Sequence, residues 1–313
     1  MERKHEKYER LLARCRGLPP VPCAVAHPCD ESSLRGALEA AQKGLIEPLL
    51  VGPAARIRAV AAAGGLDLGG VAIVDAPHSE AAAAAAVGEV RAGRAQALMK
   101  GSLHTDELMA AVVQRDSGLR TGRRISHCFV LDVPALAQPL IVTDAAVNIA
   151  PTLQDKQHIV QNAIDLARAL GRATPKVAIL SAMETVNPAV PSTIEAAALC
   201  KMAERGQIVG GVLDGPLALD NAIDAAAAAQ KGIDSAVAGH ADILVAPDLE
   251  AGNMLAKSLV YLAGADAAGI VLGARVPIVL TSRADSLIAR SASCAVAVLL
   301  VQQRLQQQAG GVR

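Results

Sequence analysis

The chain alternates between short runs of apolar, often β-branched residues and longer segments whose apolar residues recur every three or four positions. Short apolar runs bounded by turn residues predict strands, and the longer spacing predicts amphipathic helices. Because strands that alternate with helices usually pair in parallel, the pattern predicts an α/β fold with a mostly parallel, doubly wound sheet. The expected strands are Val21–Ala26, Pro48–Val51, Val71–Asp75, Ala97–Lys100, Ile125–Leu131, Leu140–Thr143, Lys176–Leu180, Ile208–Leu213, Ile243–Ala246 and Val276–Leu280.

The segment Leu153–Leu170 gives the clearest helical pattern. Gly171 follows directly, in the position where helices commonly end in a left-handed residue. The alanine runs Ala81–Ala86 and Ala225–Ala229 also favour helix. The apolar face expected for the first helix consists of Ile159, Val160, Ala163, Ile164, Ala167 and Leu170.

Chain length favours two domains, because 313 residues are many for one hydrophobic core and few for three. The segments Pro134–Pro139 and Gly273–Pro277 are the expected crossings between them. We therefore expect a discontinuous first α/β domain, residues 1–138 plus 276–313, and a second α/β domain, residues 139–275. Pockets occur preferentially between domains, so the active site is expected in the cleft.

Composition and charge exclude several classes of protein. Hydrophobic residues make up 52% of the chain, yet its longest apolar runs are too short to span a bilayer. The N-terminus is charged from its second residue and lacks the apolar core of a secretion signal, which predicts a soluble, cytoplasmic protein. Thirty basic and thirty acidic residues cancel, and one Phe, two Tyr and no Trp offer few rings for base stacking, so no nucleic-acid partner is expected.

Several familiar site motifs are missing from the sequence. No two of the 26 glycines are two positions apart, which excludes a Gly-x-Gly-x-x-Gly dinucleotide loop, and there is no P-loop. Gly-x-Ser-x-Gly, His-Glu-x-x-His and histidine pairs with ligand spacing are also missing, so no metal site is expected. Six scattered cysteines form no Cys-x-x-Cys pair and are expected to be buried small apolar residues or inactive thiols: Cys15, Cys23, Cys29, Cys128, Cys200 and Cys294.

The stretch Pro277–Arg290 carries the most informative chemistry. A strand-like run ends in Thr281, after which Ser282, Arg283 and Asp285 precede a helical pattern. Ligands of α/β proteins bind at the carboxyl ends of strands, and the N–H groups of a following helix favour an anion. Ser and Asp are also ordinary helix caps, but a cap does not need a guanidinium, whereas a phosphate does. This segment is therefore interpreted as an anion-handling active site.

Five further polar clusters each follow a predicted strand. Each could also be loop and cap chemistry, since Asp, Asn, Gly and Thr are common in turns. The two lysines in them could lie on a solvated surface, and His104 could be an ordinary helix-start residue. The clusters are Lys100-Gly101-Ser102 with His104-Thr105; Thr143-Asp144 with Asn148; Glu184-Thr185 with Asn187; Asp214-Gly215-Pro216 with Asp220-Asn221; and Pro247-Asp248 with Gly252-Asn253 and Lys257.

Ordered segments of the chain resemble the phosphate acetyl/butyryltransferase family. The likeness covers nearly all of the chain beyond about Ala95 and is most similar to the butyryltransferase-like branch, through the segment 281–286. The segments that carry it are Leu98–Ser102, Ser126-His127, Thr143–Pro151, Gln161–Ala163, Glu184–Pro188, Lys201–Gly206, Asp214–Asn221, Ala238–Asp242, Gly252-Asn253 and Leu280–Ser286.

The resemblance implies reversible acyl transfer between coenzyme A and inorganic phosphate, by direct attack in a ternary complex. It implies a two-domain α/β/α fold like that of the isocitrate and isopropylmalate dehydrogenases, in a homodimer or higher homo-oligomer. Coenzyme A would be a substrate, with no permanently bound cofactor. Ser282 would bind its sulfur, and Arg283 would bind phosphate or the acyl carbonyl oxygen. Substrate binding is assigned to Lys100, Gly101, His104, Thr105, Ser126, Thr143, Asp144, Asn148, Asp214, Gly215, Pro216, Asp248, Gly252, Asn253, Lys257 and Thr281.

Two departures from the family pattern leave roles open. A thiol attacks as thiolate, so a base is needed, and Asp285 is the candidate. The acetyltransferase branch has its carboxylate seven positions after the serine, where this chain has Ala289. Proton removal could instead fall to Asp144, Asp214 or solvent. An arginine common early in the helix after Lys-Gly is also missing; the phosphate contact could come from Arg120, Arg123 or Arg124, or these could form a solvated turn.

Two alternative functions stay open from the sequence. One is an NAD- and metal-dependent hydroxy-acid dehydrogenase of the same fold, because fold does not fix function. The other is a non-catalytic protein that binds acyl coenzyme A. The preferred acyl group is also open among acetyl, propionyl and butyryl, since one methylene discriminates weakly in an aliphatic pocket.

Overall fold

The computed structural model describes residues 5–281 and 285–310. Contacts group the chain into two compact units. Unit 1 comprises Met1–Lys7 and Arg124–Ala267, and unit 2 comprises Tyr8–Arg123 and Ala268–Arg313. The expected domain limits at 138/139 and 275/276 fall inside unit 1 and unit 2, respectively. As domain limits they stay predictions, and so does the cleft.

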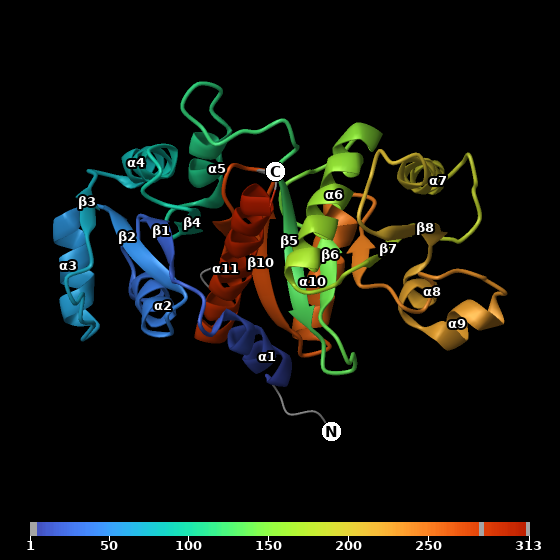
Figure 1. Ribbon diagram of the computed structural model, residues 1–313, viewed down its shortest axis with the longest axis horizontal. Helices are drawn as coiled ribbons and strands as arrows, with labels where there is room; N and C mark the ends of the chain where they lie inside the picture. The colour runs from blue at the N-terminus through green and yellow to red at the C-terminus, as the bar shows by residue number, and fades with distance from the viewer. Residues whose placement is uncertain (1–4, 282–284, 311–313) are drawn as a thin grey trace. The chain divides into compact units, whose positions relative to one another are not determined.

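Unit 2 is built on strands in the order β3-β2-β1-β4-β11-β10. Figure 1 labels all of these strands except β11. These neighbours pair in parallel except for β10 and β11, which are antiparallel. The strands are β1 (Val21–Ala26), β2 (Ile46–Gly52), β3 (Ile73–Asp75), β4 (Ala97–Lys100), β10 (Asp266–Leu272) and β11 (Ile278–Val279). The helices of this part of the chain are α1 (Glu6–Cys15), α2 (Glu31–Gln42), α3 (Ala54–Ala63), α4 (Ser79–Arg91), α5 (Thr105–Val113) and α11 (Leu287–Gly310).

The strand order of unit 2 determines which face each helix covers. Crossovers through α2 and α3 move the chain one way along the sheet, and the crossover through α4 brings it back past β1. Because parallel crossovers are right-handed, α4 covers the face opposite to α2 and α3. α4 packs against α5, and α2 packs against α11, which completes three layers. The order reverses between β1 and β4, and such a reversal is where open α/β sheets bind ligands.

Unit 1 is built on strands in the order β5-β6-β9-β7-β8. Figure 1 labels all of these strands except β9. β5 and β6 form an antiparallel pair, and the other neighbours are parallel. The strands are β5 (Ser126–Asp132), β6 (Leu140–Thr143), β7 (Lys176–Leu180), β8 (Val212–Leu217) and β9 (Ile243–Val245). The helices are α6 (Leu153–Ala169), α7 (Pro191–Glu204), α8 (Leu219–Ile223), α9 (Ala225–Gln230) and α10 (Leu249–Tyr261).

Helix α6 confirms the strongest helical prediction. Thr152 caps it: its side chain accepts a hydrogen bond from the backbone N–H of Asp155, while the Asp155 carboxylate accepts one from the backbone N–H of Thr152. All five predicted apolar residues from Ile159 to Ala167 are at most 1% exposed. Gly171 has a φ of +89°, the left-handed conformation expected after a helix.

The fold class, a mostly parallel three-layer α/β/α protein, is confirmed, but one strand is displaced from its predicted position and another was not predicted. β8 covers 212–217, whereas 208–213 was expected; it lies at the end of the strand order, where Asp214 and Pro216 are tolerated. The apolar residues Ile208 and Val209 precede it in a loop. β10 was not predicted, because it opens with Asp-Ala-Ala-Gly, which has low strand propensity.

None of the helices in residues 5–281 and 285–310 combines the length and the apolar character needed to span a bilayer.

Candidate functional site

The segment after β11 carries the three residues predicted to be catalytic. Ser282 and Arg283 lie outside the described residues. Asp285 is half-buried and directly precedes Ser286, whose Oγ accepts a hydrogen bond from the backbone N–H of Ala289 at 3.1 Å. Ser286 therefore caps α11, the role that the sequence left open for Asp285. The catalytic roles of all three residues stay predictions.

Lys100, Gly101 and Thr281 lie at the carboxyl edge of unit 2. β4 lies between β1 and β11 and runs parallel to both, with Lys100 paired to Ala26. The carboxyl ends of β1, β4 and β11 therefore lie side by side at one edge of the sheet. The strand order reverses between β1 and β4, at the same place. Lys100 is 5% exposed and Thr281 is 4% exposed. The sequence placed these residues correctly at strand ends, and their contact with substrate stays a prediction.

Gly101 is required by the close approach of two strand ends. A Cβ atom at this position would lie 2.4 Å from the carbonyl oxygen of Ala26 and 2.6 Å from that of His27. The backbone of β4 is held there because the Gly101 N–H donates to the Ala26 oxygen at 2.9 Å and the Ser102 N–H donates to the His27 oxygen at 2.9 Å. No side chain fits without moving one of these strand ends.

Replacing Gly101 with alanine is expected to lower the free energy of unfolding by roughly 1–3 kcal/mol, the usual cost of overpacking. Thermal unfolding measured by circular dichroism checks this. Gly88→Ala is the matched control: Gly88 lies inside α4, and a Cβ atom there meets nothing within 4 Å. That variant should be neutral or more stable, because alanine is the better helix former. Equal melting temperatures for Gly101→Ala and the wild type would contradict the tight contact.

His27 belongs to this edge, although the sequence analysis did not single it out. It is 8% exposed and adopts a φ of +52°, which is uncommon for a residue with a side chain. Its Nδ1 lies 3.1 Å from the Ser102 Oγ, and that hydroxyl donates to the His27 carbonyl oxygen at 2.8 Å. Burial lowers the pKa of His27, and the positive charge of Arg56 lowers it further. The available signal was a histidine directly after a predicted strand.

Arg290 is a second residue that the sequence analysis missed. Its side chain is 2% exposed and follows the candidate segment by one turn of α11. Its Nη1 donates to the Thr281 Oγ1 at 3.0 Å and its Nη2 donates to the Ser32 Oγ at 3.3 Å. The alkyl part lies against Gly36, where a Cβ atom would come within 2.6 Å of the arginine Cδ. A buried guanidinium therefore anchors the residue that precedes Ser282.

Asp144, at the carboxyl end of β6 in unit 1, accepts four hydrogen bonds. Its Oδ1 accepts from the backbone N–H groups of Ala146 at 2.9 Å and Val147 at 3.1 Å. Its Oδ2 accepts from the backbone N–H of Asn148 at 3.2 Å and from that residue's side-chain amide. A carboxylate offers about four acceptor positions, so this one is fully used. The geometry favours a role in shaping the loop over removal of a proton from substrate.

The Asn148 side chain makes three hydrogen bonds within unit 1, out of the four that an amide can make. Its side chain is 2% exposed. The Oδ1 accepts from the Arg124 Nε at 2.7 Å, and the Nδ2 donates to the Ile125 carbonyl oxygen at 2.9 Å and to Asp144. Asn148 is thus placed to orient its neighbours, and its contact with substrate stays a prediction.

The start of α10 supports the loop that contains Asp144. Asn253 donates from Nδ2 to the Ala145 carbonyl oxygen at 3.0 Å. Gly252 is buried, and a Cβ atom there would lie 2.4 Å from the Asp144 carbonyl oxygen. Gly252 therefore lies against Asp144, and Asn253 is bonded to the residue that follows Asp144.

Ser126 and Thr143 are fully buried in strands of unit 1. The Ser126 Oγ accepts from the Asn162 side-chain amide at 2.9 Å, and the Thr143 Oγ1 donates to the His127 carbonyl oxygen at 2.8 Å. Both hydroxyls are hydrogen-bonded within unit 1, and their contact with substrate stays a prediction.

The other predicted residues of unit 1 have varied surroundings. Asp214, Gly215 and Pro216 lie within β8 and not after it, a correction that follows from the shifted strand. Asp248 caps α10 by accepting from a backbone N–H, and Lys257 is exposed on that helix.

His104 and Thr105 start α5 in unit 2 and are exposed. The His104 backbone N–H donates to Glu107 at 2.7 Å, which matches the helix-start role that the sequence left open.

His127, next to Ser126 in β5, is a buried histidine. It is 1% exposed, and its ring meets the Phe129 ring edge-on at a centroid separation of 4.4 Å. Its Nδ1 has no hydrogen-bond partner within the described part of the chain. Burial lowers the pKa of His127 to about 4, against an opposing effect of the Asp144 charge. The imidazole is therefore neutral near pH 7.

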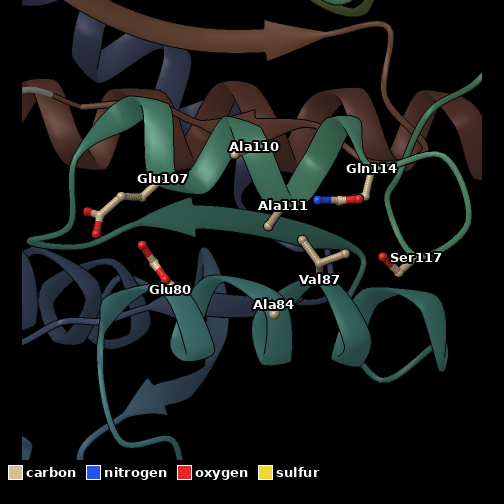
Figure 2. Close-up of a pocket in the computed structure, with 8 residues that line it drawn as sticks. All are labelled: Glu80, Ala84, Val87, Glu107, Ala110, Ala111, Gln114 and Ser117. Carbon is tan, nitrogen blue, oxygen red and sulfur yellow. The ribbon is translucent and has the colours of Figure 1, made fainter.

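A pocket of about 340 Å³ lies between α4 and α5 in unit 2 (Figure 2). Glu80 and Glu107 stand at one end, and Gln114 and Ser117 at the other (Figure 2). None of the predicted site residues lines it, and Glu107 is already bonded to the Ser79 hydroxyl at 2.6 Å. The lining residues are Glu80, Ala84, Val87, Glu107, Ala110, Ala111, Gln114 and Ser117.

All six cysteines are free thiols, five of them buried and Cys200 half-buried. Burial raises the pKa of Cys128 and of Cys200 to about 12. The expectation of small buried side chains is confirmed for the five. Across the described residues, no three His, Cys, Asp or Glu side chains are grouped so as to hold a metal ion.

Comparison with known proteins gives consistent results. Residues 78–298 match the family model described as "Phosphate acetyl/butaryl transferase". The chain is 65% identical to the phosphate acetyltransferase of Rhizobium meliloti, over 98% of this chain and 97% of that protein. It is 46% identical to a probable phosphate butyryltransferase of Bacillus subtilis (strain 168), over 88% and 91% of the two chains. The crystal structure of a branched-chain phosphotransacylase from Enterococcus faecalis V583 is similar, with a TM-score of 0.77 and 30% identity, covering 90% of this chain and 99% of that one.

Proposed function

Because the chain belongs to the phosphate acetyl/butyryltransferase family, we propose that it catalyses the reversible transfer of a short acyl group between coenzyme A and inorganic phosphate. The observation that carries this proposal is 65% identity to a phosphate acetyltransferase along almost the whole of both chains. The higher identity to that protein than to the butyryltransferase relative supports acetyl as the preferred group. The alternative dehydrogenase finds no support in these relatives.

The proposed chemistry is direct transfer in a ternary complex. The coenzyme A thiolate attacks the carbonyl carbon of the acyl phosphate. A carbon–sulfur bond forms, the bond from that carbon to the phosphate oxygen breaks, and inorganic phosphate leaves. Asp285 takes the thiol proton, Ser282 orients the sulfur, and Arg283 stabilises the negative charge that develops on the carbonyl oxygen. Holding sulfur, carbon and phosphate in line supplies much of the acceleration.

The strand-end residues are proposed to form the surroundings of this reaction. Lys100, Gly101 and Thr281 border the candidate segment in unit 2, and the Asp144 loop provides the edge in unit 1. Coenzyme A is a substrate in this scheme, with no permanently bound cofactor. A cleft between the units, a homodimer or higher homo-oligomer and a cytoplasmic location are parts of the same proposal.

The proposal is tested by thiol release from acetyl-, propionyl- and butyryl-coenzyme A, followed with a thiol reagent. We expect release only when inorganic phosphate is present, and the highest kcat/KM for the acetyl thioester. A single methylene in an aliphatic pocket should change kcat/KM by roughly 10-fold or more. Binding of acyl coenzyme A without turnover would favour the non-catalytic alternative. A nicotinamide absorbance change with NAD and a divalent metal would favour the dehydrogenase.

A further inference from the structure

Arg124 lies two residues before β5 and is an exposed arginine that is anchored beside the Asp144 loop. Its backbone N–H donates to the His158 Nδ1 at 3.0 Å, and its carbonyl oxygen accepts from the Asn162 side-chain amide at 2.9 Å. Both partners lie on α6, so the backbone of Arg124 is tied to that helix at two points.

The Arg124 side chain is held at one end only. Its Nε donates to the Asn148 Oδ1 at 2.7 Å and lies 3.6 Å from the Asp155 Oδ1. Its two terminal Nη groups make no hydrogen bond to any residue that the structure describes, and the side chain is 53% exposed. A guanidinium fixed through Nε has a set plane and presents two parallel donors to whatever approaches it.

The two side chains that contact Arg124 are each held in place by other residues, so Arg124 is not needed to fix them. Asn148 is 2% exposed, and both N–H groups of its side-chain amide are bonded, one of them to Asp144, so its Oδ1 is held in place as an acceptor. Asp155 already caps α6 through Thr152, so its carboxylate does not depend on Arg124. A tie between α6 and the loop would use the terminal nitrogens, which carry most of the donors. Here they are the part that is left accessible.

We propose that Arg124 is a substrate-binding residue whose Nη groups bind a phosphoryl group, and that Asn148 is the positioning residue that aims it. This inference rests on the proposed function and adds a residue of unit 1 to it. A planar fork of donors matches two oxygens of a phosphoryl group, whereas the point charge of a lysine does not. The phosphoryl group can come from inorganic phosphate or from coenzyme A.

Steady-state kinetics of Arg124→Gln distinguish these sources. If Arg124 binds inorganic phosphate, we expect the KM for phosphate to rise roughly 10- to 100-fold, as for a lost charge-assisted hydrogen bond, with kcat changed far less. If it binds a phosphate of the coenzyme, the KM for acetyl-coenzyme A rises instead. With a thioester that lacks the 3′-phosphate, the difference from wild type disappears if Arg124 binds that group and persists if it binds the diphosphate. Either outcome supports the proposal. Both KM values within twofold of wild type would overturn it.

Three further variants separate binding from structure. Arg124→Lys keeps the charge and should recover only part of the affinity, and Arg124→Ala should be partly rescued by added guanidinium ion, which a purely structural defect would not be. Arg205→Gln removes the same charge from an exposed site at the end of α7 and should leave both KM values unchanged. An equal rise in Arg205→Gln would show a general charge effect and contradict the assignment. Melting temperatures check that each variant is folded.

Calorimetric titration separates failure of this inference from failure of the proposed function. Inorganic phosphate and coenzyme A are each titrated into wild type and Arg124→Gln without turnover. Weaker binding of either ligand to the variant supports the assignment of Arg124 even if wild type transfers no acyl group. Identical affinities for both ligands reject it, even if wild type is an active transferase.

Discussion

Replacing Arg283 with alanine is expected to lower kcat roughly 10²- to 10³-fold, as for the loss of one oxyanion donor. In the proposed reaction, negative charge develops on the carbonyl oxygen beside an already charged phosphate, and a guanidinium stabilises that charge more in the transition state than in the ground state. The measurement is kcat for acetyl-coenzyme A with saturating phosphate, with circular dichroism to show that the variant is folded.

Two companion variants sharpen this expectation. Arg283→Lys keeps the charge but loses the planar fork, so its kcat should lie between those of Arg283→Ala and the wild type. Ser282→Ala should reduce kcat less than Arg283→Ala if the serine only orients sulfur. Near-native activity in Arg283→Ala would remove the arginine from the proposed mechanism. Trapping an acyl-serine by mass spectrometry would overturn direct transfer.

Acidification from pH 7 to pH 4 is expected to destabilise the wild-type protein by roughly 3 kcal/mol through His127 alone. Burial lowers the pKa of His127 to about 4 in the folded protein, from the ordinary value of 6.5. Between these values the unfolded chain binds a proton that the folded chain does not. The neutral imidazole therefore contributes its full stability above pH 6.5, and this contribution is lost as pH falls toward 4.

Urea unfolding of His127→Gln at a series of pH values measures this contribution. The variant should show a shallower loss of stability between pH 6.5 and 4 than the wild type, because glutamine does not titrate. His240→Gln, which replaces an exposed histidine, should keep the wild-type slope. Parallel curves for the wild type and His127→Gln would mean that another group carries the acid sensitivity.

Much of the fold could be predicted from the sequence where one pattern dominated. The helix at 153–169 has a regular apolar face and is followed by a left-handed Gly171, and both lie where they were expected. The prediction for β8 lay four residues too early, because Ile208 and Val209 are typical strand residues. The strand itself, 212–217, contains Asp214, Gly215 and Pro216, which are not. Its place at the end of the strand order, which makes these residues acceptable, is a property of the sheet and not of the segment.

The candidate site could be predicted by position but not by role. Polar residues were correctly placed at the end of a strand for Lys100 and after a strand for Asp144 and Asp248, because the carboxyl edge collects such residues. The sequence did not reveal that the side chains of Asp144 and Asn148 are hydrogen-bonded to other protein groups, because the pairing of donors and acceptors depends on loop geometry. It also gave three neighbouring arginines equal weight, whereas the structure separates Arg124 by its anchors on α6 and Asn148.

The order in which unit 2 is assembled from the chain has a consequence for biosynthesis. β1 to β4 come from residues before 124, whereas β11, the neighbour of β4, and α11, which packs on α2, come from residues after 268. The main segment of unit 1, residues 124–267, lies between these two parts of unit 2 in the sequence. Unit 1 is therefore fully synthesised before unit 2 is. Until translation passes β11, a nascent chain therefore exposes an open edge on β4, which is the kind of surface that chaperones protect and that aggregation exploits.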